Sequence, residues 1–255
     1  MKEIQSTKAK KHLGQNFLMN EKVIDMIVDS NQLTEDDFVL EIGPGTGNLT
    51  RRILKKTKKY LGIEKDETLR KKLTNYNIEY TDALEFDKAK LPKTYKIIAN
   101  IPYYITSPLI NYYLKNSFIN QHPIPEKLTL MVQKEVAEKI IDHKKKSVLS
   151  LQVQAFADVK LLCNVPKEDF SPIPKVDSAV IVIEPYKTWK FKTEITHFFK
   201  CLNILFASKR KTIKNNLKPF KKTLKLNDVI LKYESRRAES LNLEELDELI
   251  YNLKI

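Results

Sequence analysis

The chain has 255 residues, of which 42% are hydrophobic and 30% are charged. This length suits one main domain with a smaller appendage, and the absence of any apolar stretch near the roughly 20 residues of a membrane span excludes an integral membrane protein. The formal net charge of +13 favours a polyanionic partner such as nucleic acid, although the abundant lysine could also reflect A/T-rich codons.

The N-terminus and the cysteines indicate the cellular compartment. The first 18 residues are basic but have no apolar region behind the charges, which argues against a secretory signal. The two cysteines, Cys163 and Cys201, are too few and too isolated for a disulfide framework or a zinc site. We therefore expect a cytoplasmic protein with reduced thiols.

Apolar runs and helix-like segments alternate along most of the chain. Side chains at helical spacing predict a first helix over residues 21–30. Because short apolar runs bounded by turn residues are typical of buried strands, the sequence predicts strands at 38–42, 60–64, 95–99, 128–132, 151–159 and 178–183. This alternation predicts an α/β fold with a parallel sheet.

The strand pattern ends near residue 190. Helices are expected at 194–206, 226–233 and 243–253, and Asn242 with Glu245 forms a capping pattern before the last of them. We therefore predict two domains, a larger α/β domain over residues 1–189 and a small helical domain over residues 190–255.

A glycine-rich loop follows the first predicted strand. Gly43, Gly45 and Gly47 are three of only five glycines in the chain, and glycine lets a ligand approach the backbone. The third glycine comes one position early for the dinucleotide pattern, which argues against NAD. Glu64 ends the next strand, where a carboxylate can accept both ribose hydroxyls of an adenosine. The loop thus predicts an adenosine-containing cofactor without a pyrophosphate, the alternative being a structural turn.

Asp82 follows a third putative strand that begins at Ile78. Its carboxylate could accept the amino group of the cofactor's adenine. A lone aspartate at a strand end is also a common helix cap, and the sequence leaves both interpretations open.

The next strand runs into Asn100-Ile101-Pro102-Tyr103, which has the form of the N-x-P-Y signature of amino-group methyltransferases. Adenine N6 is a poor nucleophile because its lone pair is delocalised into the ring. The Asn100 side-chain oxygen and the Ile101 carbonyl could each accept an N6 hydrogen, Pro102 would fix the turn, and Tyr103 would stack on a base withdrawn from its helix. The alternative is a proline turn with a core aromatic residue. A methyl donor such as S-adenosylmethionine brings its own leaving group, so the transfer would need no metal ion.

Five blocks of the chain, in this order, resemble the ribosomal RNA adenine-N6 dimethyltransferases that act on the small subunit. These blocks are Gly14-Gln15-Asn16-Phe17-Leu18, Glu41-Ile42-Gly43-Pro44-Gly45-Thr46-Gly47, Asn100-Ile101-Pro102-Tyr103, Met131-Val132-Gln133-Lys134-Glu135-Val136-Ala137 and Phe170-Ser171-Pro172-Ile173-Pro174-Lys175-Val176-Asp177-Ser178-Ala179-Val180. The resemblance implies a Rossmann-like S-adenosylmethionine-dependent methyltransferase domain followed by a small C-terminal helical domain.

The resemblance also implies roles for individual residues. Asn16 and Leu18 would close over S-adenosylmethionine, and Phe170 would face Tyr103 across the target adenine. Considered alone, Phe170 would instead be expected in the hydrophobic core. The remaining cofactor residues would be Gly43, Gly45, Glu64, Asp82 and Asn100. The implied reaction adds two methyl groups to each of two adjacent adenines near the 3′ end of small-subunit ribosomal RNA, within a pre-assembled subunit and by a monomeric enzyme.

Three other functions compete with this interpretation. Methyltransferases that modify large-subunit RNA share much of the pattern, but Gly14-Gln15, Gly43-Pro44-Gly45 and Ser107-Pro108 favour the small-subunit group. A DNA adenine methyltransferase would need a sizeable target-recognition domain, for which the chain has little room. A binding protein without turnover would have no use for acceptors of N6 hydrogens.

Two lysine-rich and arginine-rich stretches, at 208–222 and 51–59, are candidates for phosphate contact. A solvated basic face is the alternative for both.

Overall fold

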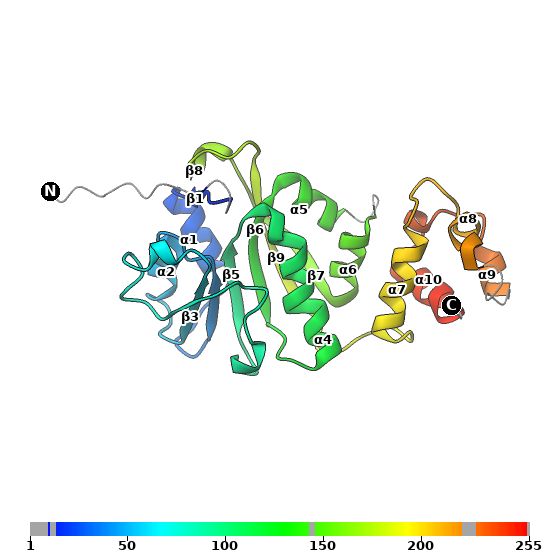
Figure 1. The fold of residues 1–255 in the computed structure, drawn as a ribbon, viewed down its shortest axis with the longest axis horizontal. Helices are drawn as coiled ribbons and strands as arrows, with labels where there is room; N and C mark the ends of the chain where they lie inside the picture. Colours follow the sequence, from blue (N-terminus) through cyan, green and yellow to red (C-terminus); the bar gives the residue numbers. More distant parts are fainter. Residues whose placement is uncertain (1–9, 11–13, 143–145, 221–227, 254–255) are drawn as a thin grey trace.

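A seven-stranded mixed sheet forms the centre of the protein. The structure is a computed structural model, and it describes residues 10, 14–142, 146–220 and 228–253 (Figure 1). The strands of the large sheet are β2 (Val39–Ile42), β3 (Tyr60–Glu64), β4 (Ile78–Tyr80), β5 (Lys96–Asn100), β6 (Lys127–Gln133), β7 (Ala157–Val165) and β9 (Ser178–Pro185). They lie in the order β4-β3-β2-β5-β6-β9-β7.

The first five strands of this order are parallel, as the sequence predicts, and β9 is antiparallel to both of its neighbours. The strand order reverses at β2, which pairs with β3 on one side and with β5 on the other. In such sheets, ligands bind outside the carboxyl ends of the strands at the point of reversal. The glycine loop after β2 and the Asn100 motif after β5 therefore meet at the expected edge.

The two faces of the sheet are buried by separate hydrophobic clusters. Ile97 belongs to one cluster and Ile98 to the other, because successive side chains of a strand point to opposite faces. On the second face, α1 (Glu21–Asp29) packs against α2 (Asn48–Ile53). The helix predicted at 21–30 is confirmed, and Asn20 caps it by accepting hydrogen bonds from the backbone of Lys22 and Val23.

Short helices follow the Asn100 motif and cover the first face. Their bounds are α3 (Thr106–Ile110), α4 (Asn116–Asn120), α5 (Lys134–Ile141) and α6 (Val148–Phe156), with a π-helix at Asn111–Lys115 between α3 and α4. Lys88 is 4% exposed, and its ammonium donates to the carbonyl of Tyr112 inside this π-helix at 2.6 Å. It thereby satisfies a carbonyl in a stretch where the regular helix pattern is broken.

The strand predicted at 151–159 is wrong for most of its length. Residues up to Phe156 form α6, and the strand β7 begins only at Ala157. Ser147 starts the helix through a capping box with Ser150. All residues from 150 to 156 are buried, and a helix that is surrounded by core has no polar face to reveal its period. The alternating sequence therefore resembled a strand.

The described residues beyond β9 contain only helical elements. These are α7 (Ile195–Leu205), α8 (Ile213–Leu217), α9 (Asp228–Tyr233) and α10 (Leu243–Tyr251), with short 3₁₀ turns between them. The helices predicted at 194–206 and 243–253 are confirmed, as is the capping box of Asn242 and Glu245. The helix predicted at 226–233 is present from residue 228, and residues 226 and 227 lie outside the described part. The helix α8 was not predicted.

Helices α7 to α10 lie at one end of the molecule, beyond α6 and β7 (Figure 1). Aromatic rings join them to the sheet. Phe156 at the end of α6 stacks on Phe199 of α7 at 5.2 Å between ring centroids, and Trp189 lies 5.1 Å from Phe156. One hydrophobic cluster therefore continues from the sheet into the C-terminal helices. No helix of the described residues combines the length and apolar character needed to cross a bilayer.

Candidate active site

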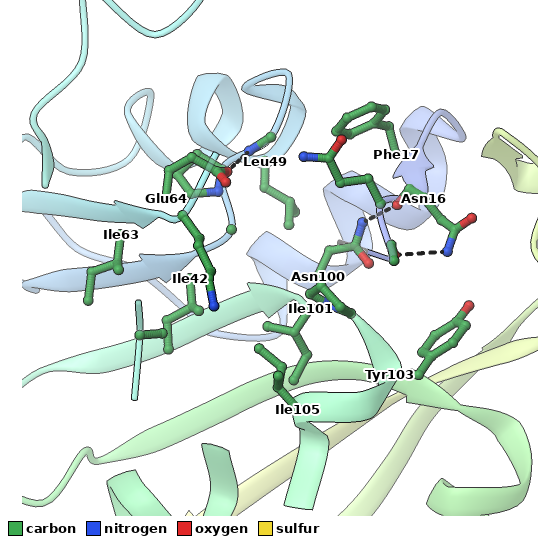
Figure 2. A pocket seen from close by; sticks show the side chains of 18 of the residues that line it. Asn16, Phe17, Ile42, Leu49, Ile63, Glu64, Asn100, Ile101, Tyr103 and Ile105 are labelled. Carbon is green, nitrogen blue, oxygen red and sulfur yellow. Dashed lines mark hydrogen bonds between the residues drawn. The ribbon is translucent and has the colours of Figure 1, made fainter. Parts of the chain in front are cut away.

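A cavity lies at the carboxyl ends of β2, β3 and β5. A segment that we call the strap, residues 14–18, forms one of its walls, and it includes the short strand β1 (Phe17–Leu18) paired with β8 (Phe170–Ser171). Figure 2 shows Glu64 at one end of the cavity and Tyr103 at the other, with Asn100 between them. The structure brings the predicted residues together here: Asn16, Leu18, Gly43, Gly45, Glu64, Asp82, Asn100, Ile101, Pro102 and Tyr103.

The glycine loop is shaped by left-handed backbone conformations. Gly45 has a φ of +60°, which disfavours any residue with a side chain. A Cβ atom at this position would also lie 3.0 Å from two ring carbons of Phe17. The loop thus needs glycine both for its conformation and because the strap passes directly over it.

The Glu64 carboxylate is held in place by the main chain. One of its oxygens accepts a hydrogen bond from the Gly45 N–H at 3.0 Å and the other from the Asp66 N–H at 2.8 Å. The residue is 6% exposed, and burial raises the pKa of its carboxyl. Each oxygen retains a lone pair, so a fixed pair of acceptors faces the cavity. This arrangement suits the two adjacent hydroxyls of a ribose.

The Asp82 side chain caps a turn and lines the cavity, and its contact with the cofactor's adenine stays a prediction. One carboxylate oxygen accepts from the Leu84 N–H at 2.9 Å, as a cap does, and the other pairs with the Lys65 ammonium at 2.7 Å. Burial alone would raise the pKa of Asp82, but the hydrogen bonds from Lys65 and Leu84 outweigh it and hold the pKa below its usual range. The residue nevertheless lines the cavity beside Glu64.

The Asn100 amide has a defined orientation. Its Nδ2 donates a hydrogen bond to the backbone carbonyl of Asn16 in the strap, at 3.2 Å (Figure 2). Since the nitrogen is engaged there, Oδ1 is the atom of the amide that can accept hydrogens from another group. The strap therefore determines which end of the Asn100 amide is available.

Tyr103 lines the cavity and is not a core aromatic residue. Its hydroxyl lies 2.7 Å from the Ser178 hydroxyl at the start of β9. Burial raises the pKa of the Tyr103 phenol, which stays neutral and able to donate. The ring is thus fixed at both ends. Sequence reasoning placed Ser178 in a strand and in the last family block but gave it no role, because the contact joins residues 75 positions apart.

Phe170 is not brought into the cavity. Its side chain is 3% exposed and packs in the hydrophobic cluster of the second sheet face with Leu18, its partner in the β1–β8 pair. The prediction that Phe170 faces Tyr103 across the substrate does not match this arrangement. A phenyl ring gains free energy from burial among apolar neighbours, and the pairing with the strap directs it there.

Glu41 is a buried acid that sequence reasoning did not single out. It is 0% exposed, and its Oε2 accepts from the Thr50 and Tyr60 hydroxyls, both at 2.6 Å. Burial raises the pKa of Glu41 to about 7, with a smaller contribution from the nearby Glu64 charge, although the two hydrogen bonds act in the opposite direction. The cluster ties β2 to α2 and β3 directly beneath the glycine loop. The sequence signal that could have revealed this buried acid was a glutamate within an otherwise apolar strand.

The two basic stretches differ in how far their charges are paired. In the stretch at 51–59, Arg52 pairs with Asp25 and Glu21, Lys56 with Asp29, and Lys59 with Asp36. Local acids therefore neutralise much of this stretch, which favours the solvated face over phosphate contact. In the other stretch, residues 209–211 are exposed in the loop before α8, and residues 221 and 222 lie outside the described part.

The chain was compared with known proteins. The sequence profile of the family described as ribosomal RNA adenine dimethylase matches residues 6–245. The Ribosomal RNA small subunit methyltransferase A of Mycoplasmopsis pulmonis is 41% identical over 97% of this chain and 100% of that protein.

Two solved structures are similar over nearly the whole chain. The dimethyladenosine transferase of Plasmodium falciparum is 30% identical with a TM-score of 0.75, covering 92% of this chain and 95% of that one. The 23S rRNA methyltransferase ErmE is 23% identical with a TM-score of 0.71, covering 93% of this chain and 99% of that one. The second similarity bears on the fold alone, and both agree with the α/β methyltransferase fold expected from the sequence.

Proposed function

Since the chain belongs to the ribosomal RNA adenine dimethylase family, we propose that it transfers methyl groups from S-adenosylmethionine to adenine N6 in small-subunit ribosomal RNA. The observation that carries this proposal is the orientation of the Asn100 amide. Its oxygen is left as an acceptor at the edge of a glycine-lined cavity whose far end holds the buried Glu64 carboxylate.

The cavity fits an adenosine-containing methyl donor. Glu64 presents a fixed carboxylate for the ribose, and Asp82 lies beside it as an acceptor for the adenine amino group. Ile42, Ile63 and Leu49 supply apolar walls for the flat base (Figure 2). Such a donor supplies the methyl group together with its own leaving group, so that the protein contributes position and dipoles.

The residues after β5 fit the acceptor side of the reaction. Oδ1 of Asn100 and the carbonyl of Ile101 each accept one hydrogen of the adenine amino group, which directs the N6 lone pair away from them and stabilises the positive charge that develops on nitrogen. Pro102 fixes the turn between these acceptors and Tyr103. The Tyr103 ring, held by Ser178, stacks on the extruded base.

The proposed substrate is a pair of adjacent adenines near the 3′ end of small-subunit RNA, each receiving two methyl groups within a pre-assembled subunit. The similarity to the small subunit methyltransferase of Mycoplasmopsis pulmonis supports the choice of the small subunit. The enzyme would act as a monomer in the cytoplasm. We further propose that residues 190–255 form an RNA-binding domain, in which the exposed basic loop at 209–211 contacts phosphates.

Transfer of labelled methyl groups to purified small ribosomal subunits tests the proposal. The wild-type protein should label adenines that mass mapping places next to each other near the RNA 3′ end. Asn100→Ala should abolish this labelling, whereas Asn120→Ala, on the exposed end of α4, should leave it unchanged. Label found only on DNA or on large-subunit RNA would contradict the assignment. A protein that binds the subunit without transferring methyl groups would be a binding factor instead.

A further inference from the structure

Asp66 is a buried carboxylate that the proposed reaction does not use. Its side chain is 2% exposed. Three side chains donate hydrogen bonds to it, namely the Lys10 ammonium at 2.7 Å, the Gln15 amide at 2.8 Å and the Thr68 hydroxyl at 2.6 Å. One of these donors, Gln15, belongs to the strap, and another, Lys10, precedes the strap in the sequence. Asp66 therefore anchors a segment that lies more than 50 residues away in the sequence.

The same residue is joined to the cofactor end of the cavity. The Asp66 N–H donates to Glu64, whose other oxygen accepts from the glycine loop at Gly45. The carboxylate that suits the ribose and the carboxylate that anchors the strap are thus two residues apart and share one hydrogen-bond network. A displacement of the strap anchor would be transmitted to both walls of the cavity.

The strap has further contacts with the Asn100 motif and with the glycine loop. The Asn16 carbonyl accepts from Asn100, and Phe17 covers Gly45. Gly14 lies against the Asn100 motif, since a Cβ on Gly14 would be 3.2 Å from the Pro102 Cβ. The strap therefore contacts both sides of the cavity in alternation, with Gln15 and Phe17 on the cofactor side and Gly14 and Asn16 on the side where the amine is expected.

We propose that Asp66 is a positioning residue for methyl transfer. By holding Gln15 and Lys10, it fixes the strap so that the Asn16 carbonyl orients the Asn100 amide with Oδ1 toward the amine, and so that Phe17 encloses the donor over the glycine loop. The inference rests on the proposed function, which it deepens. The Asp66 carboxylate would thereby couple donor binding to the geometry of the acceptor site.

The anchor is charged under ordinary conditions. Burial alone would raise the pKa of Asp66, but the hydrogen bonds from Lys10, Thr68 and Gln15 lower it to about 2. A carboxylate that stays ionised accepts stronger hydrogen bonds than a neutral group. The strap is consequently held by charge-assisted contacts, which an amide at position 66 cannot replace.

The decisive variant is Asp66→Asn, measured by titration calorimetry with S-adenosylmethionine. Loss of the charged acceptor should weaken donor binding about tenfold or more. Turnover at saturating donor should also fall, because the Asn100 amide is no longer held. Asp36→Asn is the matched control, since Asp36 pairs with Lys59 at 2.8 Å while its side chain is 96% exposed. It should bind the donor as the wild type does.

Hydrogen exchange of the strap amides, without any donor, provides an independent measurement. Exchange at residues 14–18 should be faster in Asp66→Asn and unchanged in Asp36→Asn. Because Asp66 also caps the backbone at Thr68, Gln15→Met tests the same contact with the cap intact, and it should accelerate strap exchange and weaken donor binding in the same direction.

The outcomes separate this inference from the proposed function. If the wild type binds the donor and Asp66→Asn and Gln15→Met bind it equally well with unchanged strap exchange, the role of Asp66 is refuted and the methyltransferase assignment stands. If the wild type does not bind the donor, the assignment fails. Unchanged strap exchange in both variants would overturn the anchor whatever the result of the binding measurement.

Discussion

Replacement of Glu41 by glutamine should change how the stability of the protein depends on pH. The wild-type carboxyl is 0% exposed, and its pKa rises from 4.5 to about 7 on folding. The folded state therefore favours the protonated acid. The stabilisation from this preference is complete below about pH 4.5 and is lost as the pH rises through 7. With about 1.36 kcal/mol for each pKa unit, the loss approaches about 3 kcal/mol at pH 8.

Urea unfolding followed by circular dichroism at pH 5, 6, 7 and 8 measures this effect. Between pH 5 and 8 the free energy of unfolding of the wild type should fall by about 2 to 3 kcal/mol more than that of Glu41→Gln. Glu135→Gln is the control, because Lys139 holds the pKa of that exposed carboxyl below its usual range and it stays ionised throughout. Wild-type and Glu41→Gln curves that run parallel across this range would refute the reasoning.

Three further changes test other parts of the structure. Gly45→Ala places a Cβ 3.0 Å from the Phe17 ring at a φ of +60°. Calorimetry should therefore show donor binding weakened about tenfold or more, and unfolding should show a stability cost of about 1–2 kcal/mol. Donor affinity equal to that of the wild type would show that the strap does not cover the loop. Tyr103→Phe loses the Ser178 contact but keeps the ring, so methylation assays should show activity reduced by no more than about tenfold. Tyr103→Ala should reduce activity far more. Equal reductions in the two variants would argue against stacking. Phe199→Ala removes a side chain of a residue that is 2% exposed. Unfolding followed by the fluorescence of the single tryptophan, Trp189, should show a destabilisation of about 3–5 kcal/mol. A destabilisation below about 1 kcal/mol would show that the aromatic contacts are dispensable.

Local patterns predicted the parallel core of the fold well. The strands β2, β3, β5 and β6 are short apolar runs between turn residues, and each lies within about two residues of its predicted position. The first strand of the C-terminal half was misplaced because the alternating residues of α6 fit a strand as well as a buried helix. Only the capping box at Ser147 separates the two, and a cap is a weaker signal than periodicity.

The short range of local sequence patterns also explains which site residues were predicted. Gly43, Glu64 and Asn100 each end or follow a strand, so strand order alone places them at one edge of the sheet. Asp66 and Ser178 act through contacts with residues 51 to 75 positions away, which no local period encodes. Phe170 was assigned to the cavity from its motif, but a motif gives a residue type and a position and does not give the direction of the side chain. The domain boundary near residue 190 stays a prediction.

The aromatic contacts of Phe156, Trp189 and Phe199 make the sheet and the C-terminal helices one continuous packed body. A packed interior does not deform gradually, so the spacing between the basic loop before α8 and the methyl-transfer cavity is set by the fold. An RNA whose backbone bound at that loop would then have to span this fixed separation to place a base in the cavity.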